Sequence, residues 1–253
     1  MKEILFSFLI LVSLIVFSQE DSLDIEPIDT NTYYSGFIVQ LQTAPYFSNN
    51  FYTRTDLSEY INDIDPKSMY QEQAGYIVGL NLAYVTTEWS LKTGLHYSKH
   101  NSLFSLTEEK DIVVGQDTSS QDIETSYMNK YQYLHVPIIF GYVSNWGKWS
   151  LTVNAGVFLS FNLVNDGLTY DFKKREIISL NENFNNFSVA YTLSANIKYP
   201  IDKNLRIYIE PYYISGINSI WEESPIYAWK QMHYGVALGI EFLLNNSETE
   251  IKE

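Results

Sequence analysis

The sequence predicts an all-β fold: an eight-stranded antiparallel up-and-down barrel that crosses a membrane with its strands and has short periplasmic turns and long extracellular loops. Three observations support this prediction. Eight segments alternate apolar with small or polar residues, the connections between them alternate in length, and aromatic residues stand in the apolar phase at both ends of the segments. Because successive side chains of a strand point to opposite faces, each segment is predicted to separate two different environments.

The eight alternating segments are the predicted strands, and they span residues 33–48, 74–86, 88–101, 131–144, 148–164, 186–200, 203–215 and 230–243. The apolar phase includes, in chain order, Val78, Leu80 and Leu82; Leu91 and Leu95; Leu151, Val153 and Val157; Ile207 and Ile209; and Val236, Leu238 and Ile240. The opposite phase includes Gln40 and Gln42; Asn81; His96; Thr152 and Asn154; and Thr192, Ser194 and Asn196. Each strand is therefore expected to have one apolar and one polar face.

The connections between the strands alternate regularly in length. Residues 86–88, 145–148 and 201–203 form tight connections, whereas residues 49–73, 101–130, 165–185 and 216–229 form long ones. Outer-membrane barrels have short periplasmic turns and longer extracellular loops. A soluble β-sandwich has no reason to alternate in this way, so the pattern favours the barrel.

Aromatic residues of the apolar phase are predicted to form a girdle at each end of the barrel. The girdle residues are Tyr76, Tyr84, Trp89, Tyr97, Tyr142, Trp149, Phe161, Tyr199, Tyr213, Tyr234 and Phe242. Eight residues separate Tyr76 from Tyr84, which is roughly 19 Å of height for a strand tilted by about 45°. With a ring added at each end, this height approaches the roughly 25 Å apolar band of outer-membrane barrels.

Alternation alone does not show which face lies inside, because a soluble lipocalin-like barrel alternates as well. The polar phase, however, contains many charged and amide side chains, and the aromatic rows suit two membrane interfaces. We therefore predict that the apolar phase faces lipid and that the polar phase faces the lumen.

The chain is predicted to consist of one barrel domain with short additions. Residues 1–18 have the layout of a secretory signal peptide, with an apolar run from Ile4 to Phe17. A short acidic leader over residues 19–32 precedes the barrel at 33–244, and a charged tail covers 245–253. No other stretch approaches the roughly 20 apolar residues of a membrane helix, so insertion must use strands.

The composition excludes several classes of function. The net charge is -14, which argues against binding of nucleic acid through a basic patch. The absence of cysteine excludes a cysteine lipid anchor, a thiolate metal site and a disulfide scaffold. The 21 tyrosines against 14 phenylalanines suit positions at a boundary with water, because tyrosine combines an apolar ring with a polar tip.

Two stretches resemble a known family. The stretch YLHVPIIFGY, Tyr133 to Tyr142, is similar to a strand of the PorT-like outer-membrane β-barrel family of Bacteroidetes-type bacteria, and GLNLAYVTTEWSLKTGLHYS, Gly79 to Ser98, is similar to a hairpin common there. The resemblance implies an outer-membrane barrel, in a family whose members mostly lack an assigned activity. Such chains often stop at the aromatic residue of the last strand, whereas here Phe242 is followed by Leu243, Leu244 and a charged tail.

Five charged residues fall in the inward phase: Lys92, Lys198, Arg206, Glu210 and Glu241. Eight strands leave an interior just wide enough for side chains, and buried charges require partners. We therefore expect an ion-pair plug in the lumen, with Arg206 and Glu241 as its first pair. A proton or ion path is the alternative.

Three of the four histidines, His96, His135 and His233, are also inward by phase, and His100 lies at the loop end of the third strand. A histidine beside a serine can act as the base of an acyl-transfer enzyme. His100 with Ser98 or Ser102 is such a candidate, but no spacing singles it out. We predict hydrogen-bonded interior histidines, with no catalytic residue, no metal site and no cofactor.

The long connections contain two further candidate features. Asp56, Glu59, Asp63 and Asp65 form an acidic stretch that we interpret as a solvated face rather than a calcium site. Trp221, Tyr227 and Trp229 suit recognition of a partner or a sugar, and they equally suit a loop folded over the barrel mouth.

Together these features predict a monomeric, non-enzymatic outer-membrane barrel with a structural or surface-interaction role through its acidic extracellular loops. The expected partners are outer-membrane lipid and lipopolysaccharide, together with a protein partner at the loops. Three alternatives remain: a narrow channel or small-ligand transporter, a lipid-modifying barrel enzyme, and a soluble exported lipocalin-like binder.

Overall fold

The computed structural model describes residues 34–54, 70–114, 117–171, 176–179, 184–219, 227–244 and 247–248. The predicted signal peptide, the acidic leader, the acidic stretch from Asp56 to Asp65 and Trp221 lie outside the described residues, as does most of the predicted tail.

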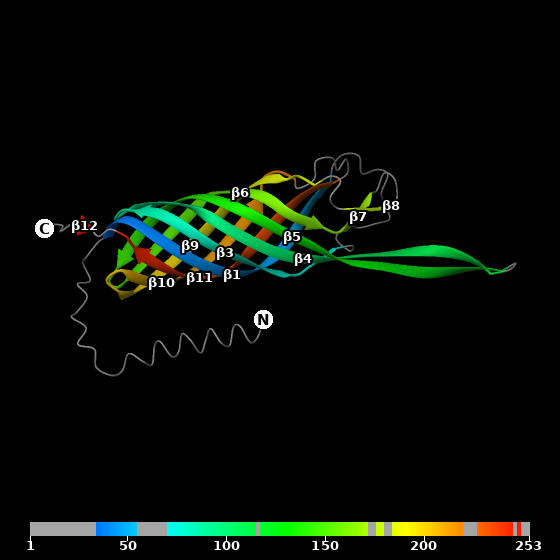
Figure 1. Ribbon diagram of the computed structural model, residues 1–253, viewed down its shortest axis with the longest axis horizontal. Coiled ribbons are helices and arrows are strands. Elements are labelled where there is room, and N and C mark those ends of the chain that lie inside the picture. Colours follow the sequence, from blue (N-terminus) through cyan, green and yellow to red (C-terminus); the bar gives the residue numbers. More distant parts are fainter. Residues whose placement is uncertain are drawn as a thin grey trace, which may run out of the picture. The chain divides into compact units, whose positions relative to one another are not determined.

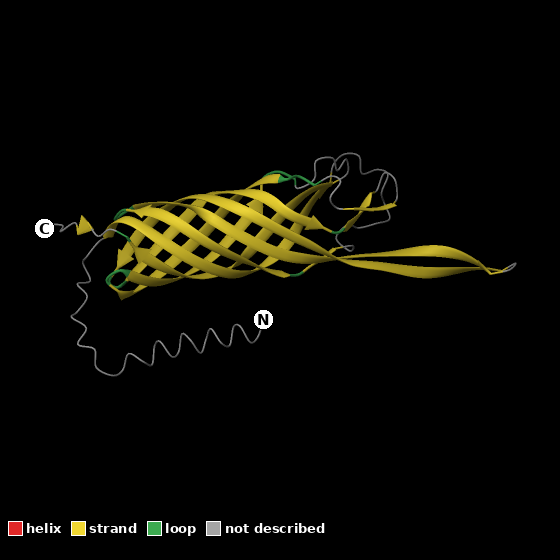
Figure 2. Cartoon of the chain, in the orientation of Figure 1, coloured by secondary structure: helices red, strands yellow, loops and turns green. Residues whose placement is uncertain are grey.

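The described residues form twelve strands (Figures 1 and 2): β1 (Tyr34–Arg54), β2 (Tyr70–Glu72), β3 (Ala74–Val85), β4 (Trp89–Val114), β5 (Asp117–Trp146), β6 (Trp149–Asp166), β7 (Leu168–Asp171), β8 (Glu176–Ser179), β9 (Phe187–Asp202), β10 (Leu205–Gly216), β11 (Tyr227–Leu243) and β12 (Ser247–Glu248). Within this described part of the chain, no helix is long and apolar enough to cross a membrane.

Eight of these strands close into an antiparallel barrel in the order β1, β3, β4, β5, β6, β9, β10, β11. Pairing of β1 with β11, from Ile38 opposite Leu243 to Arg54 opposite Tyr227, completes the ring. Strand β2 pairs with β4, β12 with β1, and β7 with β8. The predicted fold class is confirmed.

The strand boundaries agree with the predicted ones within a few residues, except at the long connections. Residues 101–130 were predicted to be a loop, but most of them are strand, because β4 continues to Val114 and β5 begins at Asp117. Strand β1 likewise continues to Arg54. Where a strand pair extends beyond the barrel, its two faces no longer meet two different environments. The alternation of apolar and polar residues that predicts strands is therefore lost.

The three tight connections use local turn chemistry. The Thr86 hydroxyl accepts hydrogen bonds from the backbone N–H groups of Glu88 and Trp89 at 3.3 and 3.0 Å. Gly147 adopts a φ of 56°, which favours glycine. The Asp202 carboxylate accepts a bond from the backbone N–H of Lys203 at 2.7 Å. Side chains and a glycine thus fix the short-turn end.

Burial shows which phase is inside. On β3 the side chain of Leu80 is 54% exposed, whereas that of the neighbouring Asn81 is 1% exposed. The same alternation runs along the whole strand, from Tyr76 outward to Ala83 inward. The apolar phase therefore faces outward and the polar phase faces the lumen, as predicted. A soluble lipocalin-like barrel would need the reverse arrangement, so that alternative is wrong.

Apolar residues fill two levels of the lumen between polar ones. One cluster contains Ile38, Ala83, Val85 and Val143, with Leu243 packed against it, close to the short-turn end. A second cluster contains Ala44, Tyr46, Ile77, Ile139, Phe158, Ala190, Ile214 and Ala237, with Tyr212 packed against it. The interior is thus largely occupied by side chains.

Two inward glycines make room for rings of neighbouring strands. A Cβ atom at Gly79 would overlap the ring of His96, and one at Gly239 would overlap the ring of Tyr208. A bulky ring therefore needs a glycine on the next strand, because eight strands enclose little volume.

We expect Gly239→Ala to destabilise the barrel by about 1–3 kcal/mol, because the added methyl group must displace the Tyr208 ring. Urea titration in detergent, followed by heat-modifiable electrophoretic mobility, measures the loss. Gly216→Ala is the matched control, since its Cβ would lie 3.4 Å from the backbone of Gln231, an ordinary contact. Equal stability of the two variants would contradict the packing argument.

Candidate functional sites in the lumen and at the long-loop end

The inward charged residues form two carboxylate centres. The Lys92 ammonium lies 3.0 Å from Oε1 of Glu210. Glu241 accepts from two cations, with Nζ of Lys198 at 2.7 Å and a guanidinium nitrogen of Arg206 at 3.4 Å. The expected pair of Arg206 and Glu241 is thus in contact, and the structure brings all five charged residues into these two centres.

Neutral side chains complete both centres. Ser194 donates to Glu210 at 2.6 Å, and the amides of Asn154 and Asn196 donate at 3.2 and 3.3 Å. Gln40 donates to Glu241 at 2.8 Å. Buried ions are tolerated only with such partners, because desolvation costs several kcal/mol per ion. Their positions in the polar phase of the sequence indicated that these side chains point inward. The sequence did not indicate to which carboxylate each of them donates.

The histidines have partners that differ from the sequence-based candidate. His135 lies between two serines, with Nε2 at 2.7 Å from Ser98 Oγ and Nδ1 at 2.7 Å from Ser160 Oγ. His100 instead contacts the Tyr46 hydroxyl through Nδ1 at 3.1 Å. The candidate pairing of His100 with Ser98 is therefore wrong. The two residues follow one another on the same face of β4, whereas His135 stands on the adjacent strand.

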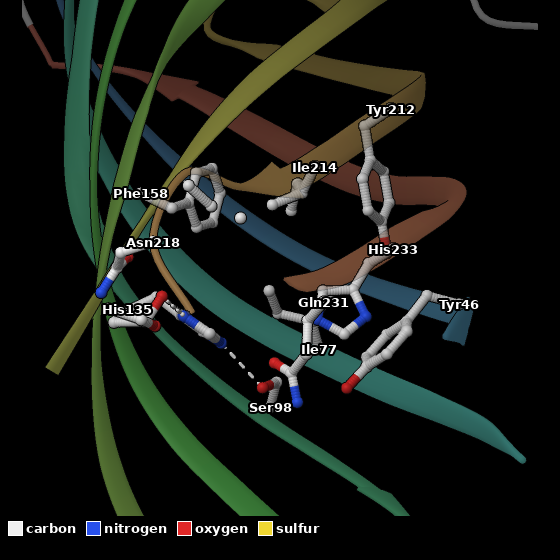
Figure 3. Close-up of a pocket in the computed structure, with 14 residues that line it drawn as sticks. Tyr46, Ile77, Ser98, His135, Phe158, Tyr212, Ile214, Asn218, Gln231 and His233 are labelled. Atoms are coloured by element: carbon white, nitrogen blue, oxygen red, sulfur yellow. Dashed lines mark hydrogen bonds between the residues drawn. The ribbon is translucent and has the colours of Figure 1, made fainter. Parts of the chain in front are cut away.

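Two small cavities lie between these groups, and Figure 3 shows the larger one. The larger has a volume of about 30 Å³ and is lined by Ser98, His135, Ser160, Tyr212 and His233, among others. The smaller, of about 20 Å³, lies beside Lys92, His96 and Glu210. A water molecule needs about 10–15 Å³ by this measure. The two cavities therefore have room for a few water molecules.

The predicted girdle residues stand on the outer face, and several of them contact one another across strands. Ring centroids are 5.7 Å apart for Tyr84 and Trp89, and 4.8 Å apart for Trp149 and Tyr199. The most exposed girdle residue is Tyr142, at 64%. The rows also include aromatic residues that the sequence analysis omitted: Phe37 beside Tyr84, Phe47 beside Tyr234, Phe187 beside Phe161, and Tyr191 beside Tyr213. These four residues fall in the outward phase of the sequence, and this signal could have identified them as girdle residues.

The candidate recognition loop is covered only in part. Tyr227 and Trp229 belong to β11, where their backbones pair with Arg54 and Tyr52. Trp221 lies outside the described residues. In the part of the chain that is described, no group of three or more acidic or histidine side chains is arranged to hold a metal ion.

A closed barrel with an apolar outer face and a polar, ion-paired lumen defines an outer-membrane barrel protein. Residues 17–222 match the family described as "Outer membrane protein beta-barrel domain", and the chain belongs to this family. Its location is therefore the outer membrane. No curated protein matches the chain.

Solved outer-membrane barrels are similar in fold. Neisserial surface protein A matches with a TM-score of 0.45 and 9% identity, covering 83% of this chain and 98% of that one. Ail, the attachment invasion locus protein of Yersinia pestis, matches with a TM-score of 0.34 and 11% identity over 82% and 99%. The outer membrane protease OmpT of Escherichia coli matches with a TM-score of 0.37 and 11% identity over 88% and 99%.

These similarities correct one expectation. The prediction that the chain is not an enzyme is wrong as a deduction from its fold class, because the solved barrels of similar fold include a protease. A plugged lumen and the lack of a recognisable spacing motif in the sequence do not exclude catalysis.

We expect Glu241→Gln to destabilise the barrel by about 3–5 kcal/mol, because it leaves Lys198 and Arg206 buried without their carboxylate. Urea titration in detergent measures the change. Combining it with Lys198→Met should recover part of the loss, since one uncompensated charge is removed. The control is Glu88→Gln in an exposed turn. If Glu241→Gln were as stable as this control, the carboxylate would not compensate the two cations.

Proposed function

We propose that the chain is a surface-interaction protein that holds an acidic β-ribbon outside the outer membrane for contact with a basic partner. The proposal rests on the observation that β4 and β5 continue beyond the barrel. Their pairing runs on from Ser105 opposite Ser126 to Val114 opposite Asp117. We name residues 105–114 and 117–126 the ribbon.

The ribbon is paired only with itself in the described part of the chain. On the β4 side, the pairing with β2 ends at Phe104, and on the β5 side the pairing with β6 ends at Lys130. Ten residues of strand extend for about 33 Å, and Figure 1 shows the ribbon projecting at the end opposite the short turns. A two-stranded ribbon is marginally stable alone in water, so a partner that packs on it would stabilise it.

The charge of the ribbon indicates the class of partner. Residues 105–126 include six acidic residues and one lysine. The register pairs Glu109 with Asp122. Like charges opposite one another are unfavourable, and a basic surface would relieve this repulsion. Electrostatic attraction of this kind also accelerates association.

The filled lumen supports this proposal over transport. Ion-pair centres, apolar clusters and small cavities occupy the interior formed by the described residues. An eight-stranded barrel has little room beyond such filling. A narrow channel or a small-ligand transporter would need a continuous path, which these groups interrupt.

Three finer proposals accompany this function. The stretch Tyr133 to Tyr142, which lies within β5, supports membership of the PorT-like barrels of Bacteroidetes-type bacteria. The apolar run at residues 4–17 supports export by a signal peptide. The outward aromatic rows support a monomer whose girdles contact outer-membrane lipid and lipopolysaccharide.

We expect the ribbon to bind a cationic probe in a salt-dependent manner. The protein is reconstituted in neutral vesicles, and binding of a fluorescent lysine-rich peptide is measured at low and high salt. Replacing residues 105–126 by an Asn-Gly turn should weaken binding at least about tenfold, or about 1.4 kcal/mol. Phe104 is retained because it is fully buried.

Two charge variants sharpen the test. Glu109→Gln with Asp122→Asn keeps the length of the ribbon and should weaken binding several-fold. The matched control, Asp63→Asn with Asp65→Asn, removes the same charge from another connection and should bind as the unmodified chain does. Unchanged binding after shortening of the ribbon would refute the proposal.

A further inference from the structure

His135 is bonded through both of its ring nitrogens to serine hydroxyls. Ser98 Oγ lies 2.7 Å from Nε2 and Ser160 Oγ lies 2.7 Å from Nδ1. A neutral imidazole has one donor and one acceptor nitrogen, so it accepts from one serine and donates to the other. The three side chains are 3%, 8% and 5% exposed for Ser98, His135 and Ser160.

The barrel register creates this arrangement from three strands. Ser160 on β6 stands directly opposite His135 on β5. On the other side, His135 pairs with His96 of β4, and Ser98 is two residues further along the same face. The imidazole therefore bridges both neighbouring strands. A base held by a third group next to a hydroxyl is the arrangement that activates a serine nucleophile.

We infer that Ser98 and His135 form a nucleophile and general-base pair for acyl transfer from small carboxylic esters. In the productive tautomer, Nε2 accepts the Ser98 proton while the Nδ1–H donates to Ser160. Ser98 and His135 are the catalytic residues, and Ser160 is a positioning residue that fixes the tautomer. Ser160 is neutral, so it stabilises the imidazolium less than the carboxylate of a serine-protease triad would.

The larger cavity gives the pair a reaction space. Ser98, His135 and Ser160 all line it, and Gly216 and Asn218 place part of its wall at the long-loop end of β10 (Figure 3). Its volume of about 30 Å³ is room for about two water molecules, so it limits the acyl group to one about the size of acetyl. Long acyl chains are too large for it, so the substrate class is short-chain esters.

The same cavity also offers hydrogen-bonding groups that are not otherwise used. Within the described residues, the Tyr212 hydroxyl and Nδ1 of His233 have no hydrogen-bond partner, and both side chains line the cavity. A buried hydroxyl without a partner costs free energy. Both groups can therefore form hydrogen bonds with a molecule that enters the cavity.

The reaction balances with these groups and water alone. Ser98 Oγ bonds to the acyl carbon while its proton passes to Nε2 of His135. The carbon–oxygen bond to the alcohol then breaks, and His135 returns the proton to the leaving alkoxide. Water next attacks the acyl-serine with His135 again accepting the proton, and the released Ser98 oxygen takes that proton back.

A single introduced thiol tests access and activation directly, because the chain contains no cysteine. In Ser98→Cys, His135 should accept the thiol proton, and iodoacetamide should alkylate the thiol at least about tenfold faster than in Ser188→Cys. Ser188 lines the same cavity and is more exposed than Ser98, so faster alkylation at position 98 cannot come from easier access. Adding His135→Gln should abolish the difference. Equal alkylation rates for the two thiols would overturn the inference.

The unmodified chain provides the second measurement. Folded protein in detergent should release nitrophenol from p-nitrophenyl acetate and carry an acetyl group on the peptide containing Ser98. Ser98→Ala and His135→Gln should lose turnover, and Ser160→Ala should lower kcat with little change in KM. Ser150→Ala, far from this cavity, serves as the control. Absence of turnover, or turnover that survives Ser98→Ala in protein with heat-modifiable mobility, would disprove the role.

Discussion

The pairing of β1 with β11 is the constraint on which the rest of the structure depends. Lipid offers no hydrogen bonds, so an open sheet would expose two rows of unpaired backbone groups at a cost of several kcal/mol each. Closure removes both edges through pairs that run from Ile38 to Arg54 on β1. It also gives each strand one face toward lipid and one toward a narrow lumen, which sets the chemistry of every side chain in the barrel.

Closure explains the Lys92–Glu210 ion pair, because it places strands that are far apart in the sheet on opposite sides of one lumen. Lys92 on β4 reaches Glu210 on β10 across the lumen, and Lys198 on β9 reaches Glu241 on β11 past the intervening strand. Desolvation makes each of these ions expensive alone. The Glu210 centre therefore joins opposite walls of the closed barrel, whereas the Glu241 centre neutralises charge among the neighbouring strands β9, β10 and β11.

Strands β4 and β5 serve both regions to which we assign function. Within the barrel they carry Ser98 and His135 on the lumen face, and beyond it they form the acidic ribbon. The regions differ in their solvent and hence in their physics. Inside, the low effective dielectric strengthens hydrogen bonds and ion pairs, whereas outside, charges act over about a Debye length and weaken with salt.

Local sequence was enough to determine the eight barrel strands, their outward apolar faces, the tight turns and the inward position of the five charged residues, since strand periodicity is a property of neighbouring residues. It also predicted Arg206 beside Glu241, which are directly paired on adjacent strands. Only the tertiary structure showed that Lys92 forms an ion pair with Glu210 and that Ser98 forms a hydrogen bond with His135 rather than with His100. It also showed that residues 101–130 are mostly strand. These contacts depend on the register and closure of the barrel, which no short stretch of sequence contains.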